Sequence, residues 1–247
     1  MKKYFKLFIQ YYLKILTKFV LWRHRPFIIA VAGSTNKTTT KDYILKFLRE
    51  KYGENEVRGN PKSYNTEIGL PLAIFYLESG ESSVIKWIKV LAQAKMRAFF
   101  CRKFPKKLVL ELGVEQKGDM KYLLEIIKPN IAIVTNIEGS YTYPNSELEL
   151  IFEEMKLLAK KVPKDGYLFL NADDERVKSL EDISQAKVIT YGFSEKADAR
   201  AENLKMDAEG QTFNFIFQKK RESIRIKKYG RHFIYAWMTA KIIKNIL

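Results

Sequence analysis

The sequence predicts an α/β fold in which a mostly parallel sheet carries helices on both of its faces. Short apolar runs typical of buried strands recur along the chain, and helical patterns separate them, as in parallel sheets. These runs lie at 27–32, 108–113, 131–136, 167–170 and 187–191. The alternation of strands and helices ends after Gly192. Three segments of alternating apolar and polar residues there predict a small antiparallel β addition near the C-terminus. These segments lie at 199–206, 211–217 and 222–227.

The expected helices alternate with these strands along the 247 residues. They lie at 3–22, 39–52, 70–77, 84–100, 119–128, 147–161 and 230–247, and a short strand is expected at Val57. A chain of this length can form one large or two small domains with a substantial core. We divide it into a basic amphipathic helix at 1–25 and one domain at 26–247, with a basic helical insertion at 84–106.

The stretch from residue 27 to residue 41 predicts a phosphate-binding loop, around which the rest of the chain is organised. The loop and the first helical residues are Gly33, Ser34, Thr35, Asn36, Lys37, Thr38 and Thr39. A buried strand, a loop and a Lys-Thr pair that opens a helix are the parts of a P-loop, whose backbone N–H groups bind phosphates. We therefore expect a P-loop mononucleotide-binding fold. Lys37 would contact the terminal phosphates of the nucleotide, and the Thr38 hydroxyl would ligate Mg²⁺.

Asn36 departs from the P-loop signature, which has glycine immediately before the lysine. Asparagine tolerates the left-handed backbone conformation better than most residues, but it adds a side chain close to the phosphates. The alternative interpretation is an ordinary threonine-rich turn between a strand and a helix.

Glu111 lies at the end of the apolar run 108–113. A charge in a buried strand needs a partner, and ligands of such folds bind at the carboxyl ends of the parallel strands. We therefore expect Glu111 to hold Mg²⁺. The alternative is a salt bridge to a basic neighbour.

The net charge of +16 is concentrated in two segments that contain no acidic residue. Residues 1–25 carry seven Lys or Arg, and residues 84–107 carry eight. Both segments are rich in aromatic and aliphatic residues with polar positions at helical spacing, which is typical of helices in a membrane interface. We expect them to bind an anionic membrane surface. The alternatives are packing against the domain or a partner chain for the first segment, and a solvated helix face for the second.

Other partners and locations follow from what the sequence lacks. The positive charge comes without a nucleic-acid-binding motif, so we expect no nucleic acid. No run of about 18 uncharged apolar residues and no signal-peptide cleavage site are present, so we expect neither a transmembrane span nor secretion. The single cysteine, Cys101, excludes an internal disulfide framework. The expected location is the cytoplasm, peripherally on the inner face of the cell membrane.

An ordered set of short motifs resembles the central ATP-binding domain of the Mur ligases, and within that family the ligase that adds D-alanyl-D-alanine. The likeness covers about residues 27–247. The matching segments are 33–41, 59–60, 65–72, 110–113, 128–130, 134–136, 170–174 and 230–232.

The resemblance implies an ATP-dependent ligase reaction. In this family ATP phosphorylates a substrate carboxylate, and an amine attacks the acyl phosphate to give an amide, ADP and phosphate. The implied roles are ATP binding by Lys37, Mg²⁺ binding by Thr38 and Glu111, substrate binding by Asn65 and Thr66, and nucleotide binding by Asn171 and Asp174.

The chain departs from the family pattern at several positions. Besides Asn36, Tyr141 stands where the family has a metal-binding histidine, and Phe233 and Ala236 stand where it has asparagines near the adenine. These losses favour a catalytically degenerate, membrane-associated homologue with a binding or scaffold role. The retained Lys37, Thr38 and Glu111 favour a ligase.

Two further differences concern the completeness of the ligase. The carbamylated lysine of the family falls at Met155, and Lys156, one residue away, is the candidate for its role. We expect the chain to lack the family's N-terminal UDP-binding domain and its C-terminal domain. A partner chain would then supply the missing parts of a working ligase.

Overall fold

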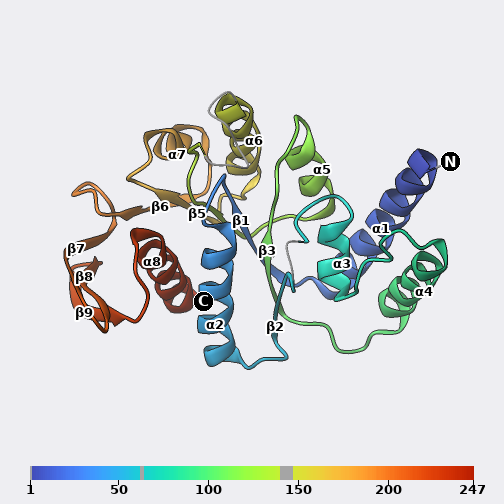
Figure 1. The fold of residues 1–247 in the computed structure, drawn as a ribbon, viewed down its shortest axis with the longest axis horizontal. Helices are drawn as coiled ribbons and strands as arrows, with labels where there is room; N and C mark the ends of the chain where they lie inside the picture. The colour runs from blue at the N-terminus through green and yellow to red at the C-terminus, as the bar shows by residue number, and fades with distance from the viewer. Residues whose placement is uncertain (1, 62–63, 140–146) are drawn as a thin grey trace.

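The described residues form one sheet with strand order β2-β3-β1-β4-β5-β6-β7-β8-β9 (Figure 1). The structure is a computed structural model that describes residues 2–61, 64–139 and 147–247. All pairings from β2 to β7 are parallel, and β7-β8 and β8-β9 are antiparallel. The strands are β1 (Phe27–Ala32), β2 (Val57–Gly59), β3 (Lys107–Glu111), β4 (Ile131–Val134), β5 (Tyr167–Asn171), β6 (Lys187–Gly192), β7 (Ala199–Asp207), β8 (Gly210–Phe217) and β9 (Lys220–Ile226). The predicted parallel sheet and its antiparallel addition are confirmed.

Helices cover both faces of the sheet, as predicted. They are α1 (Lys2–His24), α2 (Lys37–Tyr52), α3 (Gly69–Phe75), α4 (Val84–Phe100), α5 (Asp119–Ile126), α6 (Leu148–Lys161), α7 (Glu175–Lys178), the 3₁₀ helix η2 (Ser179–Ile183) and α8 (Arg231–Ile246). The short helices α7 and η2 were not predicted. The molecule is elongated, with α1 and α4 at one end and β7–β9 at the other (Figure 1).

Strand β1, which lies between β3 and β4, contacts both layers of the core because its successive side chains point to opposite faces. Ile28, Ala30 and Ala32 pack with α1 and α3–α6, whereas Ile29 and Val31 pack with α2 and α8. All five side chains are buried. The unbroken apolar run in the sequence therefore reflects burial on both faces.

Helix α1 packs one of its faces against α3, α4 and α5. Ile9, Leu13 and Val20 are almost completely buried in this contact. Lys14 forms an ion pair of 2.5 Å with Glu125 of α5. The first basic segment therefore packs on its own domain, the alternative left open by the sequence, but only through one of its faces. Among the described residues, no helix is both long and apolar enough to cross a bilayer.

Candidate functional site

The loop between β1 and α2 adopts the backbone conformations expected of a phosphate-binding loop. Gly33 has φ 132° and Asn36 has φ 63°, and both values lie in the region that favours glycine. A Cβ atom on Gly33 would lie only 2.2 Å from the Thr135 hydroxyl, so no other residue fits there. Helix α2 begins at Lys37, two residues earlier than predicted, with Asn36 as its left-handed N-cap.

Residues that follow β4 hold this loop in place. The Ser34 N–H donates to the Asn136 carbonyl at 2.7 Å, and the Thr135 hydroxyl donates to the Thr35 carbonyl at 2.6 Å. The Thr35 hydroxyl in turn donates to the Glu138 carboxylate at 2.7 Å. Sequence reasoning did not assign Glu138 to the site. Its position just after a buried strand beside β1 was the signal that could have found it.

The Asn36 side chain also turns toward the residues after β4. Its amide donates to the Asn136 side-chain oxygen at 3.3 Å and to the Thr35 hydroxyl at 3.4 Å. The asparagine that replaces the signature glycine is therefore tied back to the neighbouring loop.

Lys37 is buried within the loop, where its ammonium donates to the carbonyls of Gly33 at 2.7 Å and Ser34 at 2.9 Å. Burial lowers the pKa of Lys37, and the nearby Glu111 carboxylate opposes part of this shift. A cation in this position can attract a negatively charged phosphate, which would regain the charge interactions that burial removes.

Three predicted residues from different segments meet at one carboxylate. The Thr38 hydroxyl donates to Glu111 Oε2 at 2.9 Å, and the Asn65 amide donates to Glu111 Oε1 at 2.9 Å. Asn60 fixes the backbone here because its side-chain oxygen accepts the Glu111 N–H at 2.8 Å. Glu111 is only 2% exposed, whereas Thr38 is exposed.

The Thr38 and Glu111 oxygens fit a magnesium site. Mg²⁺ prefers oxygen ligands and commonly combines one or two protein ligands with phosphate oxygens and water. The residues described contain no group of three or more His, Cys, Asp and Glu side chains that could hold a metal. Mg²⁺ at Thr38 and Glu111 would therefore depend on nucleotide phosphates for much of its coordination.

The second predicted substrate residue, Thr66, lines a cavity of about 390 Å³ beside this cluster. Gly113, two residues after Glu111, lines the same cavity, together with Lys6 of α1. The remaining lining residues are Glu67, Glu115, Gln116, Asp119 and Leu123. This cavity offers space for a substrate group beside the residues that surround Glu111.

Asn171 and Asp174 lie where expected, at the carboxyl end of β5, and Asp174 also contacts the segment after β4. The Asn171 side chain accepts the Asp173 N–H at 3.1 Å. Asp174 accepts the Ile137 N–H at 2.7 Å and caps α7 through the Val177 N–H at 3.1 Å. Asp174 thereby ties the turn after β5 to the segment after β4.

Asp173, which was not predicted, connects this turn to helix α8. Its carboxylate accepts hydrogen bonds from the Tyr235 hydroxyl at 2.8 Å and from the N–H groups of Phe193 and Ser194. Burial, with the Asp173 contact as a further cause, raises the pKa of Tyr235.

The structure describes most of the positions at which the chain departs from the family pattern. Lys156 forms an ion pair with Glu153 and lies 4.4 Å from the Phe152 ring centre, so these contacts keep it on its own helix, α6. Met155 is completely buried. On α8, Phe233 packs against His232 and Ala236 is buried. Tyr141 lies outside the described residues.

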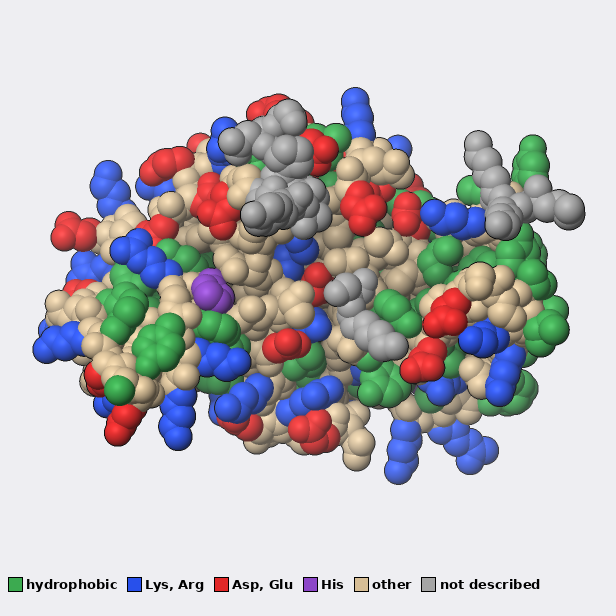
Figure 2. Space-filling view, viewed as in Figure 1, with side chains coloured by type: hydrophobic (Ala, Val, Ile, Leu, Met, Phe, Trp, Pro, Cys, Tyr) green, Lys and Arg blue, Asp and Glu red, His purple; other side chains and the backbone are tan. Residues whose placement is uncertain are grey.

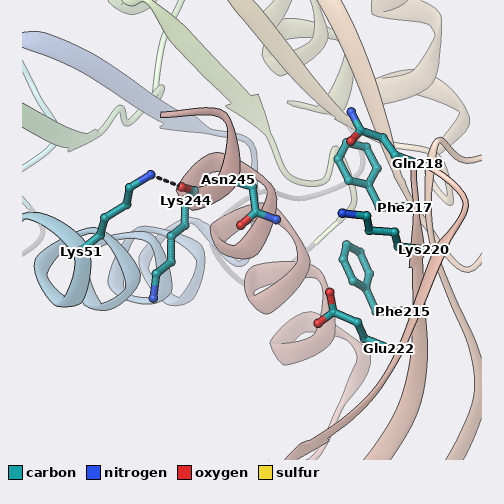
Figure 3. Close-up of a pocket in the computed structure, with 8 residues that line it drawn as sticks. All are labelled: Lys51, Phe215, Phe217, Gln218, Lys220, Glu222, Lys244 and Asn245. Carbon is teal, nitrogen blue, oxygen red and sulfur yellow. Dashed lines mark hydrogen bonds between the residues drawn. The ribbon is translucent and has the colours of Figure 1, made fainter.

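A separate cavity of about 500 Å³ lies between α2, α8 and the β8–β9 hairpin (Figure 3). Its lining residues are Lys51, Phe215, Phe217, Gln218, Lys220, Glu222, Lys244 and Asn245. It contains none of the residues predicted to bind nucleotide or metal.

A mostly parallel sheet with this loop at the end of the interior strand β1 defines an α/β domain of the P-loop type. A family model described as the Mur ligase middle domain matches residues 88–243. The chain therefore belongs to the Mur ligase family, and is related to ATP-dependent ligases of peptidoglycan precursors.

Curated relatives agree with this assignment. The chain is 29% identical over 217 residues to the UDP-N-acetylmuramoyl-tripeptide–D-alanyl-D-alanine ligase of Borreliella burgdorferi, covering 84% of this chain and 38% of that enzyme. The ligase of the same name from Bacillus subtilis is 27% identical over 213 residues, covering 86% of this chain and 40% of that enzyme. The chain thus spans well under half the length of these relatives.

Solved structures share the fold. MurF from Thermotoga maritima, solved in complex with ADP, has a TM-score of 0.73 and 19% identity, covering 95% of this chain and 48% of that one. MurF from Acinetobacter baumannii has a TM-score of 0.71 and 15% identity, covering 95% of this chain and 46% of that one. The resemblance to Mur ligases that the sequence motifs indicated is confirmed.

Proposed function

We propose that this chain binds ATP with Mg²⁺ at the loop 33–39 and provides the ATP site of an amide-forming ligase. The observation that carries the proposal is the meeting of Thr38 and Glu111 beside the buried Lys37. Lys37 would contact the terminal phosphates, and the backbone N–H groups at the start of α2 would bind the others. The structure of the Thermotoga maritima relative in complex with ADP supports nucleotide binding by this fold.

The chemistry proposed is phosphorylation of a carboxylate, followed by amide formation. A substrate carboxylate oxygen attacks the γ-phosphorus of ATP and ADP leaves. An amine nitrogen then attacks the acyl carbon, phosphate leaves, and the nitrogen loses a proton. Asn65 and Thr66 would position the carboxylate substrate, and Asn171 and Asp174 would support the nucleotide side. Mg²⁺, when bound at Thr38 and Glu111, would neutralise charge on the phosphates.

Partners and location complete the proposal. The named relatives are more than twice as long as this chain, so other protein parts, such as a partner chain, would supply the remaining substrate sites. Lys156 would serve as the family's modified lysine only if the nucleotide complex draws it away from Glu153. We place the function in the cytoplasm, on the inner face of the cell membrane, where ATP and anionic lipid are both present.

A second candidate function is a membrane-associated scaffold without catalysis. Two observations favour it. The Asn36 amide is tied to Asn136 near the expected phosphate position, and α8 carries Phe233 and Ala236 where family members have asparagines. Such a protein would retain the fold and lose tight nucleotide binding.

Isothermal titration calorimetry with ATP and Mg²⁺ distinguishes the two candidates. The wild-type chain should bind, and Lys37→Ala should lose at least about tenfold in affinity because a charge-assisted contact to phosphate disappears. Lys46→Ala, an exposed lysine on the same helix, is the matched control and should bind like the wild type. Absence of binding by the folded wild-type chain would leave the scaffold as the function.

A further inference from the structure

Helix α1 carries apolar residues on two opposite faces. Ile9, Leu13, Leu16 and Val20 are buried against the domain. On the outer face, large side chains at spacings of three, four or seven residues are 49% to 79% exposed. They are Tyr4, Leu7, Phe8, Tyr11, Ile15 and Trp22. A surface helix normally places polar residues on its outer face, so this second apolar stripe needs another explanation.

Helix α4 repeats the same arrangement. Trp87, Val90, Ala94 and Ala98 are buried on its inner face. An outward stripe recurs every three or four residues, and its large side chains are 46% to 81% exposed. The stripe consists of Ile85, Ile88, Ala92, Met96 and Phe99.

The two stripes join into one surface. The rings of Phe19 and Phe99 lie 4.8 Å apart, and Trp22 lies 6.1 Å from Phe19. Arg23 locks the helix ends together by donating to the Phe99 carbonyl at 2.6 Å. Twelve of the sixteen exposed large hydrophobic residues in the described chain belong to α1 and α4. Figure 2 shows hydrophobic side chains gathered at this end of the molecule. We name the outer faces of α1 and α4 the α1–α4 platform.

The charges around the platform are positive. Neither helix contains an acidic residue, and Lys18, Lys89 and Lys95 are exposed on them. Acidic neighbours on adjoining segments compensate only part of this charge, through ion pairs of Lys14 with Glu125 and Lys86 with Glu81.

A cavity of about 550 Å³ at the C-terminal end of α1 adds to this pattern. Lys18, Arg25 and Lys128 line it together with Trp22, and its one acidic residue is Glu125, which is already paired with Lys14. Its other lining residues are Leu21, Pro26, Ile28, Ile126 and Asn130. Its size and positive charge suit an anionic lipid headgroup next to the apolar stripe.

We propose that the α1–α4 platform lies in the interface of an anionic lipid bilayer. The outer stripes would insert among the acyl chains, and the flanking lysines would contact anionic headgroups, as in interfacial amphipathic helices. An apolar surface bordered by cations with no acid on either helix complements a negatively charged bilayer better than a second, equally basic copy of the chain. The proposal refines the membrane location proposed above and does not depend on nucleotide binding.

Flotation with phosphatidylcholine vesicles, with and without phosphatidylglycerol, tests the platform. The wild-type chain should float only with vesicles that contain phosphatidylglycerol. Ile88→Gln with Met96→Gln should weaken this binding by at least about tenfold, because two apolar side chains that would move from water into the bilayer are replaced by polar ones. The matched control, Leu157→Gln with Met206→Gln, changes exposed apolar residues elsewhere and should bind like the wild type.

A second set of variants tests how much the lysine charges contribute to vesicle binding. Lys89→Gln with Lys95→Gln should also weaken binding at least about tenfold, whereas Lys160→Gln with Lys161→Gln on α6 should not. Equal flotation of wild type and the stripe variant, or equal binding to both kinds of vesicle, would overturn the proposal. So would a dimer in sedimentation velocity that the stripe variant abolishes while no vesicle binds. ATP titration of the same samples tests the ligase function separately from membrane binding. Loss of nucleotide binding would contradict only the ligase function.

Discussion

The Thr38 hydroxyl donates a 2.9 Å hydrogen bond to the Glu111 carboxylate, which joins the start of α2 to the carboxyl end of β3. The other oxygen of the same carboxylate accepts a hydrogen bond from Asn65. One buried acidic group thus connects the loop proposed to hold phosphates with the loop proposed to hold the carboxylate substrate. A Mg²⁺ ion bound here would be held by a carboxylate that contacts both loops.

Replacement of this carboxylate should uncouple Mg²⁺ from ATP binding. Glu111→Gln keeps an oxygen that can accept from Asn65, so the chain should remain folded. The neutral amide is a poor Mg²⁺ ligand, and the gain in ATP affinity produced by Mg²⁺ should fall at least about tenfold. Calorimetric titrations with Mg²⁺ and with EDTA measure this gain. Glu149→Gln, which changes an exposed carboxylate on α6, is the control, and an unchanged gain in Glu111→Gln would remove Glu111 from the metal site.

The fold could be predicted because burial on both faces leaves a continuous apolar run. In β1, Ile28 and Ile29 face different core layers, so neither could be polar. The ends of elements were predicted less accurately because tertiary contacts set them. Residues 135–136 were predicted as strand, but the Thr135 hydroxyl donates to the Thr35 carbonyl and the chain turns away to hold the loop.

The candidate site was predicted as far as local motifs extend. The Lys37-Thr38 pair and Glu111 are recognisable from the strand that precedes each of them. Contacts made between distant segments were missed. The position of Glu138 after a buried strand places it near the site but does not identify Thr35 as its partner, and no local pattern marks Asp173 as the partner of Tyr235. The outward stripes of α1 and α4 could not be predicted either. When apolar residues surround a helix, the sequence does not show which face packs against the domain.

The left-handed backbone of Asn36 predicts a difference between two small substitutions. Glycine adopts φ 63° without steric cost, so Asn36→Gly should match the wild-type free energy of unfolding within about 0.5 kcal/mol. Alanine resists this conformation, so Asn36→Ala should be about 1 kcal/mol less stable than Asn36→Gly. Urea unfolding followed by circular dichroism measures both.

The same glycine variant tests whether the asparagine side chain obstructs phosphate. Asn36→Gly removes the amide that is tied to Asn136 and should bind ATP at least as tightly as the wild type. Weaker binding by a variant of unchanged stability would mean that the amide itself contacts the nucleotide.

Glu154 should be a structural carboxylate whose loss is costly. It is 3% exposed on α6 and accepts the N–H groups of Gly118 and Met120, each at 2.8 Å, at the start of α5. Glu154→Ala leaves these donors without that acceptor and should lower the free energy of unfolding by about 2–4 kcal/mol. Glu153→Ala, which removes an exposed ion pair on the same helix, should change it by less than about 1 kcal/mol. Equal losses in urea unfolding would contradict the capping role.

Tyr122 should make the attachment of α1 sensitive to alkaline pH. Its hydroxyl lies 3.4 Å from the Gln10 carbonyl, and Lys14 lies 4.3 Å from its ring centre. Burial, then the charges of Glu67 and Glu125, raises its pKa to about 12. The unfolded chain therefore loses this phenolic proton first, near pH 10, and the free energy of unfolding should fall from about pH 10 to about pH 12. Urea unfolding across this range should show a shallower fall for Tyr122→Phe than for the wild type. Tyr11→Phe, which changes an exposed ring on α1, is the control, and parallel curves for wild type and Tyr122→Phe would refute this linkage.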